Sequence, residues 1–310
     1  MVDKIDILKK LEEANISIIN EDNIVEGRTK ADELGHGTFG LVRKGSLKKE
    51  NVDVAIKELF FDNSYTPDEV IKEIMNELLA FKIVEKVHES IVKFYGVFIQ
   101  PKRICFVFEL IKGKELSSLY KNMSDKKKLE VIIDICDVLS VLHKKKLIHR
   151  DIKPNNVMIE DSGKVRIIDF GTVKIAKNEN TFTINQKGTD NYMSPELLQI
   201  IESEADDDED NDDKEDICHF SVSPKVDVWA VGCLISEIFS GIIPWVNLIG
   251  NKNQNAVRFK LKKKTPFPIP SSIENNDIKE AIKKCTEIDL DKRCNIDELK
   301  AMIEDIVKKL

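Results

Sequence analysis

Two short polar runs contain the side-chain types that phosphoryl transfer requires. The first is His149-Arg150-Asp151-Ile152-Lys153-Pro154-Asn155-Asn156, and the second, Asp169-Phe170-Gly171, begins 13 residues after Asn156. Phosphoryl transfer needs a carboxylate that accepts the proton of the attacking hydroxyl, and oxygen ligands for the magnesium ions that neutralise phosphate charge. Asp151 has the chemistry for the first task, and Asn156 and Asp169 have the chemistry for the second.

The two runs are separated by strand-like residues 157–159 and 165–168. In this order they resemble the catalytic and magnesium loops of the eukaryotic protein kinase family. The resemblance implies that Asp151 is the catalytic base and that Asn156 and Asp169 hold Mg²⁺. Lys153, two residues after the base, resembles the serine/threonine branch of the family, where this lysine steadies the γ-phosphate of ATP.

A glycine-rich segment lies further towards the N-terminus. Glycines at this spacing let a backbone close over phosphates, so that amide hydrogens can point at the oxygens. Alone, the pattern also suits a dinucleotide-binding fold. Here the strand-like run Val54-Ala55-Ile56-Lys57 follows in place of a helix, which rejects the dinucleotide fold. The predicted ATP-binding loop comprises Leu34, Gly35, His36, Gly37, Thr38, Phe39, Gly40, Leu41 and Val42.

Lys57 ends this apolar strand, and the resemblance implies that it contacts the α- and β-phosphates of ATP. Such a lysine needs a carboxylate on the following helix to hold it in place, and Glu77 is the expected partner. The distance from Glu77 to the next recognisable motif, residues 88–92, is about two residues longer than the usual family pattern. Glu73, one helical turn earlier, is therefore an alternative. Phe170 is expected to pack against this helix.

The resemblance also places residues around the adenine ring. Phe108 aligns with the gatekeeper position, and its bulk predicts a closed rear pocket. The backbones of Glu109 and Ile111 are expected to bond the adenine edge. The apolar residues expected to sandwich the ring are Val42, Ala55 and Met158, for each of which ordinary core packing is the alternative.

Residues 188–196, which include Thr189, resemble the end of an activation segment. Within them Glu196 needs a buried cationic partner, and Arg293 lies where the family supplies one. Asp227 is expected to accept backbone hydrogen bonds from the catalytic loop.

Arg150 precedes the proposed base and has a regulatory consequence. A guanidinium at this position attracts an anion, which a phosphate on the segment between Gly171 and Gly188 can supply. Thr181 and Thr183 are the candidate phosphorylation sites.

The elements that must position these residues follow from periodicity. Strand patterns and helical patterns alternate along the first third of the chain, and helical patterns dominate afterwards. Strands are expected at residues 41–45, 52–57, 91–99 and 103–110, and helices at 66–87, 127–144, 227–240 and 297–309. The resemblance implies that these elements form a two-lobed α+β kinase fold: a small β-rich N-lobe with one key helix at about 28–111, and a larger, mainly α-helical C-lobe at about 112–310. Residues 1–27 are expected to be an extension with a short helix.

One acidic segment sets the charge balance. Residues 202–216 hold eleven acids and one lysine, a net charge of −10, so the rest of the chain carries +3 against a total of −7. A segment of this composition cannot bury apolar surface, and we expect a disordered surface insertion at about 200–222. A solvated loop without function and a docking or autoregulatory element are both open.

The amino-acid composition indicates the class of protein and its expected location in the cell. The 42% apolar content is ordinary for a soluble domain, and the longest apolar run contains Asp227 and Glu237, which argues against a membrane span. Six cysteines without Cys-x-x-Cys spacing fit a reduced protein, so we expect a cytoplasmic location, with access to the nucleus left open. Specific nucleic-acid binding has no supporting module.

The leading hypothesis is an active serine/threonine kinase that uses ATP and Mg²⁺ on protein substrates in signalling. Its activation would follow phosphorylation by an upstream kinase or by itself. A pseudokinase scaffold that binds nucleotide is the alternative, and it would be favoured by loss of Lys57, Asp151, Asn156 or Asp169, all of which are present. A kinase of small metabolites is a third reading, which residues 189–196 disfavour. The sequence leaves the oligomeric state open.

Overall fold

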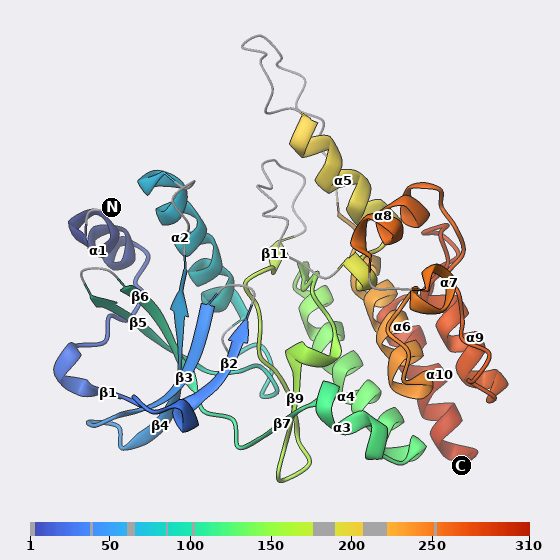
Figure 1. Cartoon of the computed structure of the whole chain (residues 1–310), viewed down its shortest axis with the longest axis horizontal. Coiled ribbons are helices and arrows are strands. Elements are labelled where there is room, and N and C mark those ends of the chain that lie inside the picture. The colour runs from blue at the N-terminus through green and yellow to red at the C-terminus, as the bar shows by residue number, and fades with distance from the viewer. Residues whose placement is uncertain are drawn as a thin grey trace. The chain divides into compact units, whose positions relative to one another are not determined.

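The computed structural model describes residues 4–37, 40–60, 66–84, 86–100, 103–175, 190–206, 222–250 and 253–310. The chain divides into two units (Figure 1). Unit 1 comprises Met1–Gly113 and Glu160–Thr172, and unit 2 comprises Lys114–Ile159 and Val173–Leu310. Unit 1 holds the main β-sheet and unit 2 holds most of the helices, so the predicted two-lobed α+β kinase fold is confirmed.

Unit 1 is built on an antiparallel six-stranded sheet of order β1-β3-β4-β6-β5, with β2 paired to β3. The strands are β1 (Ile24–Glu26), β2 (Glu33–Gly37), β3 (Gly40–Leu47), β4 (Val52–Leu59), β5 (Phe94–Gln100) and β6 (Arg103–Glu109). Unit 1 also contains helices α1 (Lys4–Glu13) and α2 (Pro67–Val84), and strand β10 (Val165–Ile167). The chain crosses between the units within β7 (Gly113–Glu115) and β9 (Val157–Glu160), and again after Thr172.

Alternation along β4 gives the sheet two different faces. Val54 and Ile56 are buried on one face, where Ile19 and Ile24 complete an apolar cluster with β3, β5 and β6. Ala55 and Lys57 point to the other face, because successive side chains of a strand alternate. Their cross-strand neighbours on β6 are Phe108 and Phe106.

Helix α2 packs an aromatic cluster onto this second face. The Phe81 ring lies 4.8 Å from that of Phe108 and 5.5 Å from that of Phe94, between ring centroids. Aromatic pairs at such distances stabilise beyond the area they bury. The helix was expected over residues 66–87 and spans Pro67–Val84.

Unit 2 is mainly helical. Its helices are α3 (Leu116–Leu119), α4 (Asp125–Lys144), α5 (Pro195–Asp206), α6 (Lys225–Ser240), α7 (Val246–Ile249), α8 (Gln254–Lys262), α9 (Asn276–Cys285) and α10 (Ile296–Lys308). Its strands β8 (Leu147–Ile148) and β11 (Lys174–Ile175) pair antiparallel. Short 3-10 turns of the chain are η1 (Glu21–Asn23), η2 (Lys30–Asp32), η3 (Tyr120–Asn122), η4 (Pro154–Asn156) and η5 (Asp190–Tyr192).

Helix α6 is the centre of unit 2. It contacts α4, α9 and α10, and it is buried from Val226 through Ile238. Side-chain caps fix where the surrounding helices begin: Ser124 accepts a bond from Lys127 N at α4, and Asn295 and Glu298 form a capping box at α10. These helices start one or two residues before the apolar periodicity predicts, because a cap lies outside the periodic pattern.

The acidic insertion was predicted to begin at about residue 200, but helix α5 continues to Asp206. Leu197, Leu198 and Ile200 are buried along its first turns, and this apolar side lets the helix extend into the acidic residues. The prediction was therefore wrong for residues 200–206. Residues 207–221 lie outside the described part of the chain. No helix that the structure describes combines the length and apolar character needed to cross a bilayer.

Candidate active site

Unit 1 brings three of the predicted residues together. Lys57 Nζ lies 2.8 Å from Glu77 Oε1, and each of the two side chains is 14% exposed. Burial would lower the pKa of Lys57, but the negative charges of Glu77 and Asp169 outweigh burial, and the pKa is raised. Lys57 therefore stays a cation beside two carboxylates. The side chain of Glu73, the alternative partner, lies outside the described part of the structure.

Asp169 and Phe170 also belong to unit 1, and contacts within this unit hold them in place. Asp169 Oδ1 accepts a hydrogen bond of 3.1 Å from the backbone N–H of Gly171. Phe170 is fully buried, and its ring meets Phe81 of α2 edge-on with centroids 6.1 Å apart. Phe170 thus packs against the helix that carries Glu77, as the resemblance implies.

The glycine-rich segment forms the β2–β3 hairpin. Gly35 pairs with Val42 and Gly37 with Gly40, while Thr38 and Phe39 lie outside the described residues. Gly40 has φ +147°, and a Cβ there would lie 1.6 Å from the carbonyl oxygen of Glu58. Only glycine fits this position. The backbone at His36 belongs to β2.

The residues expected around adenine lie mostly in unit 1. Val42 and Ala55 are half-buried on the Lys57 side of the sheet, Phe108 is buried, Ile111 is half-buried and Leu34 is exposed. Val42 is the direct cross-strand neighbour of Lys57. Met158, half-buried in β9, belongs to unit 2.

An ion-pair network at the end of β6 was not predicted. The carboxylate of Glu109 binds the guanidinium of Arg166 and accepts a bond of 2.6 Å from Lys93 N. Arg166 also binds Glu160 at 2.8 Å and donates to the carbonyl of Ile91. Burial lowers the pKa of this arginine. The signal in the sequence was a single charge inside the apolar run 165–168.

Unit 2 gathers the remaining catalytic-loop residues around Asp151. Lys153 Nζ lies 2.8 Å from Asp151 Oδ2 and 3.0 Å from Oδ1. The amide nitrogen of Asn156 donates to the same carboxylate at 2.7 Å and to the Asp151 carbonyl at 2.8 Å. Asp151 is thus oriented by a cation and an amide.

Asp227 holds the backbone of this loop, as predicted. Its carboxylate accepts bonds from His149 N at 2.9 Å and Arg150 N at 2.7 Å, and His143 Nε2 lies 2.8 Å away. Burial would raise the pKa of Asp227, but its contacts with His143 and His149 outweigh burial and lower it. Arg150 has φ +69°, an uncommon conformation that these bonds help to maintain.

Glu196 forms the expected ion pair with the buried Arg293. Arg293 Nη1 lies 2.5 Å from Glu196 Oε1, and Nη2 lies 3.1 Å from Oε2, a bidentate contact. The Arg293 side chain is fully buried, and its guanidinium lies 5.0 Å from the Trp229 ring centroid. Through Arg293, helix α5 is fixed to the segment before α10.

Two further polar contacts near α5 were not predicted. Arg258 binds the buried Asp190 through two bonds of 2.6 and 3.2 Å, and Tyr192 donates its hydroxyl to Glu237. Burial and the Glu237 charge raise the pKa of Tyr192. Thr181, Thr183 and Thr189 lie outside the described residues.

Comparison with known proteins agrees with this arrangement. The model of the protein kinase domain matches residues 28–303. The chain is 29% identical to the serine/threonine-protein kinase Nek10 of Homo sapiens, over 98% of this chain and 25% of that protein. It is 28% identical to mitogen-activated protein kinase kinase kinase 5 of Arabidopsis thaliana, over 79% of this chain and 32% of the relative. It is also 28% identical to the Aurora kinase of Schizosaccharomyces pombe, over 86% of this chain and 68% of that kinase.

The chain spans about a quarter of the length of the Nek10 proteins that it matches. The family match nevertheless covers most of the chain and includes every catalytic motif found above. This chain therefore belongs to the protein kinase family.

Proposed function

We propose that this protein transfers the γ-phosphate of ATP to serine and threonine hydroxyls of protein substrates. The observation that carries the proposal is the Asp151 cluster of unit 2, in which a carboxylate is oriented by Lys153 and Asn156. The Lys57–Glu77 pair of unit 1 supports it independently. Each chemical role that the reaction needs is filled once.

In the proposed reaction, Asp151 accepts the proton of the acceptor hydroxyl. The hydroxyl oxygen forms a bond to the γ-phosphorus, the bond from that phosphorus to the β,γ-bridging oxygen breaks, and ADP leaves. Lys153 stabilises the charge of the transferred phosphoryl group, and Lys57 contacts the α- and β-phosphates. The carboxylate of Glu77 holds the Lys57 ammonium in place for that contact.

The residues present suit Mg²⁺. Both contacts of the Asn156 amide nitrogen are made to Asp151, so the amide oxygen is available as a ligand, and Asp169 supplies a carboxylate. Mg²⁺ is usually bound through one or two such side chains together with substrate phosphates. When bound, it neutralises negative charge on the phosphates.

A transfer assay tests the proposal and separates it from the alternatives. The protein is incubated with ATP, Mg²⁺ and either generic protein substrates or a mixture of small metabolites. Phosphorylated products are identified by mass spectrometry, and nucleotide binding is measured by calorimetry. Phosphoserine and phosphothreonine formed by the wild type support the proposal. Nucleotide binding without transfer would favour the pseudokinase scaffold, and transfer to small molecules alone would favour the metabolite kinase.

Regulation by phosphorylation is a second part of the proposal. Arg150 lies beside the base, and a phosphate on Thr181 or Thr183 would supply an anion near it. Comparison of phosphate-free and phosphorylated enzyme, with Thr181→Ala, Thr183→Ala and the double variant, tests this. Equal rates for all of these forms would reject it. A role in signalling and a cytoplasmic location stay predictions, which imaging of the tagged full-length protein can address.

A further inference from the structure

The residues before the family-matched region form part of unit 1. The family model of the kinase domain matches from residue 28. Residues 4–27, here called the extension, precede it and form helix α1, an extended segment, η1 and β1. Ile7 and Leu11 of α1 are 2% and 0% exposed. An amphipathic helix of ten residues needs such a partner surface, because short helices are marginal on their own.

Helix α1 packs against α2, the helix that carries Glu77 (Figure 1). Lys82, in the last turn of α2, donates its ammonium to the carbonyl of Ala14, directly after α1. A cation bound to the carbonyl end of a helix is favourable for the helix dipole as well. The extension thus contacts α2 five residues from Glu77.

The chain after α1 is bonded to the edge of the sheet. Ile19 N donates to the Val97 carbonyl at 2.8 Å, and Val97 N donates to the Ser17 carbonyl at 2.8 Å. Gly96 beside them has φ +149°, and a Cβ there would lie 2.4 Å from the Ser17 carbonyl oxygen. The strand is therefore shaped to accept the extension at this point.

A second set of contacts fixes the end of the extension. Asn23 accepts a bond from Lys49 N at 2.8 Å through its side chain, and donates to Glu50 at 3.0 Å, so it holds the β3–β4 turn. Ile24 then enters the apolar cluster of the sheet, and Ile24–Glu26 pairs with β3.

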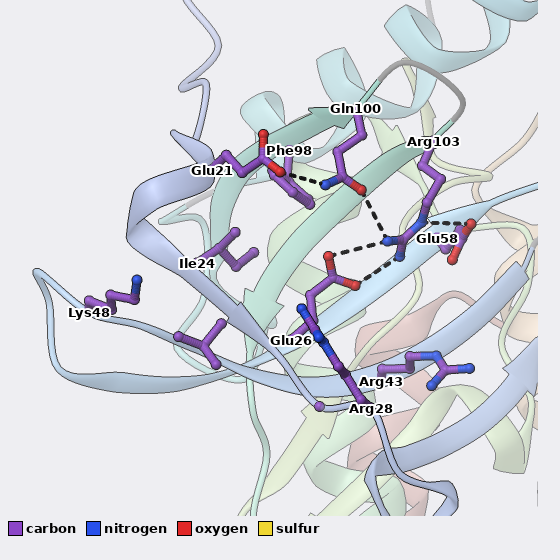
Figure 2. Close-up of a pocket in the computed structure, with 12 residues that line it drawn as sticks. Glu21, Ile24, Glu26, Arg28, Arg43, Lys48, Glu58, Phe98, Gln100 and Arg103 are labelled. Atoms are coloured by element: carbon purple, nitrogen blue, oxygen red, sulfur yellow. Dashed lines mark hydrogen bonds and ion pairs between the residues drawn. The ribbon is translucent and has the colours of Figure 1, made fainter.

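Figure 2 shows a polar connection between the extension and the sheet. Arg103 of β6 binds Glu26 of the extension at 2.9 and 3.2 Å and lies 2.9 Å from Glu58 of β4. Burial would lower the pKa of Arg103, but the two glutamates outweigh it and raise it. Gln100 binds Glu21 at 2.9 Å. These residues line a cavity of about 790 Å³ between the extension and the sheet.

We propose that the extension is a positioning element for catalysis. The extension is bonded to β5, to the β3–β4 turn and to β6. These contacts fix the extension on the sheet, so that α1 holds α2 in the position where Glu77 meets Lys57. Leu11 and Lys82 are the positioning residues, and they act through Glu77. The effect on catalysis rests on the proposed kinase function, whereas the effect on α2 does not.

Hydrogen exchange measured by mass spectrometry on the full chain tests the structural part. Leu11→Ala truncates a buried side chain of α1. The matched control is Leu299→Ala in α10, because Leu299 is as fully buried as Leu11. We expect exchange in peptides from 67–84 to rise about tenfold or more in Leu11→Ala, with little change in peptides from 125–144. In Leu299→Ala, exchange should rise in peptides from 125–144 and change little in peptides from 67–84. Equal protection of α2 in Leu11→Ala and Leu299→Ala would overturn the proposal.

Lys82→Met is a milder variant, which keeps the fold if Leu11→Ala does not. It removes the bond to Ala14 and retains the aliphatic stem, and a modest rise of exchange within α2 is expected. No rise in a folded Lys82→Met protein would remove Lys82 from the proposal.

A double-mutant cycle tests the catalytic part. If Leu11 acts through Glu77, then Leu11→Ala should lower kcat in the wild type and have little further effect in Glu77→Gln. Leu299→Ala should lower kcat by the same factor in both backgrounds. Equal factors for Leu11→Ala in both backgrounds would refute action through Glu77. If the wild type transfers no phosphate, the kinase proposal fails, and the exchange experiment still decides the role of the extension.

Discussion

Replacing Glu77 by glutamine removes the negative charge beside Lys57 and keeps a side chain of nearly the same size. Lys57 Nζ and Glu77 Oε1 are 2.8 Å apart, and both side chains are 14% exposed, so solvent screens their interaction only in part. A hydrogen bond to a charged group contributes about 1.5–3 kcal/mol, against about 0.5–1.5 kcal/mol for a neutral one. The substitution should therefore cost about 1–2 kcal/mol of the energy that holds Lys57 in place.

If this energy is used to position Lys57 in the transition state, kcat/KM should fall about 5- to 30-fold, mainly in kcat. Steady-state phosphorylation of a protein substrate measures it, with the exposed Glu280→Gln as a control that should change kcat/KM less than about twofold. Unchanged kcat/KM in a correctly folded Glu77→Gln protein would refute the reasoning.

The pH dependence of stability checks the same pair. Because the folded-state pKa of Lys57 is raised, its stabilisation is fully present below the ordinary value of 10.5 and is lost as the pH rises through the folded-state pKa. The difference in unfolding free energy between wild type and Lys57→Met, which removes the titrating ammonium itself, should therefore be constant from about pH 7 to pH 9. A decline within that interval would show that Lys57 does not have a raised pKa.

Three further predictions concern buried groups. Arg293→Leu leaves Glu196 without its bidentate partner. In urea titrations it should lower the free energy of unfolding by about 3–5 kcal/mol. A loss below about 1 kcal/mol would contradict a structural role for the pair. Asp227→Asn should destabilise the protein at neutral pH. Since the folded pKa of Asp227 is lowered, this loss should shrink only as the pH falls below 3.8 through the folded value, and a loss that shrinks already between pH 7 and pH 5 would count against that shift. Phe108→Ala should cost about 3–5 kcal/mol of stability and make the enzyme sensitive to ATP-competitive inhibitors with a bulky group behind adenine, whereas equal resistance of both proteins would exclude Phe108 as the barrier.

Local sequence patterns were sufficient for much of the fold and for the local part of the site. Helix α4 and strand β4 carry clear apolar periodicity, and Asp151, Lys153 and Asn156 interact within six consecutive residues. The Lys57–Glu77 contact spans 20 residues and was expected only because a family resemblance supplied the pairing.

Interactions between residues distant in sequence were not predicted from local pattern. Asp190 and Arg258 are 68 residues apart, and Glu109 and Arg166 are 57 apart. Neither member of these pairs carries a local signal that identifies its partner. Strand β1 has three residues, which is too short for a period of two to be recognised. Helix α9 lies outside the predicted helices although Ile278, Ala281, Ile282 and Cys285 have helical spacing, so this helix was missed despite a local signal.

The most direct test of the central claim compares wild type with Asp151→Asn under single-turnover conditions, at saturating ATP and Mg²⁺. Asparagine keeps the shape of the side chain but cannot accept the hydroxyl proton. We predict that phosphoryl transfer to serine or threonine slows by about 10²- to 10⁴-fold, while calorimetry gives the same affinity for ATP. Equal transfer rates in the two proteins, or no heat of nucleotide binding to well-folded wild type, would contradict the assignment of this chain as a protein kinase that uses Asp151 as its base.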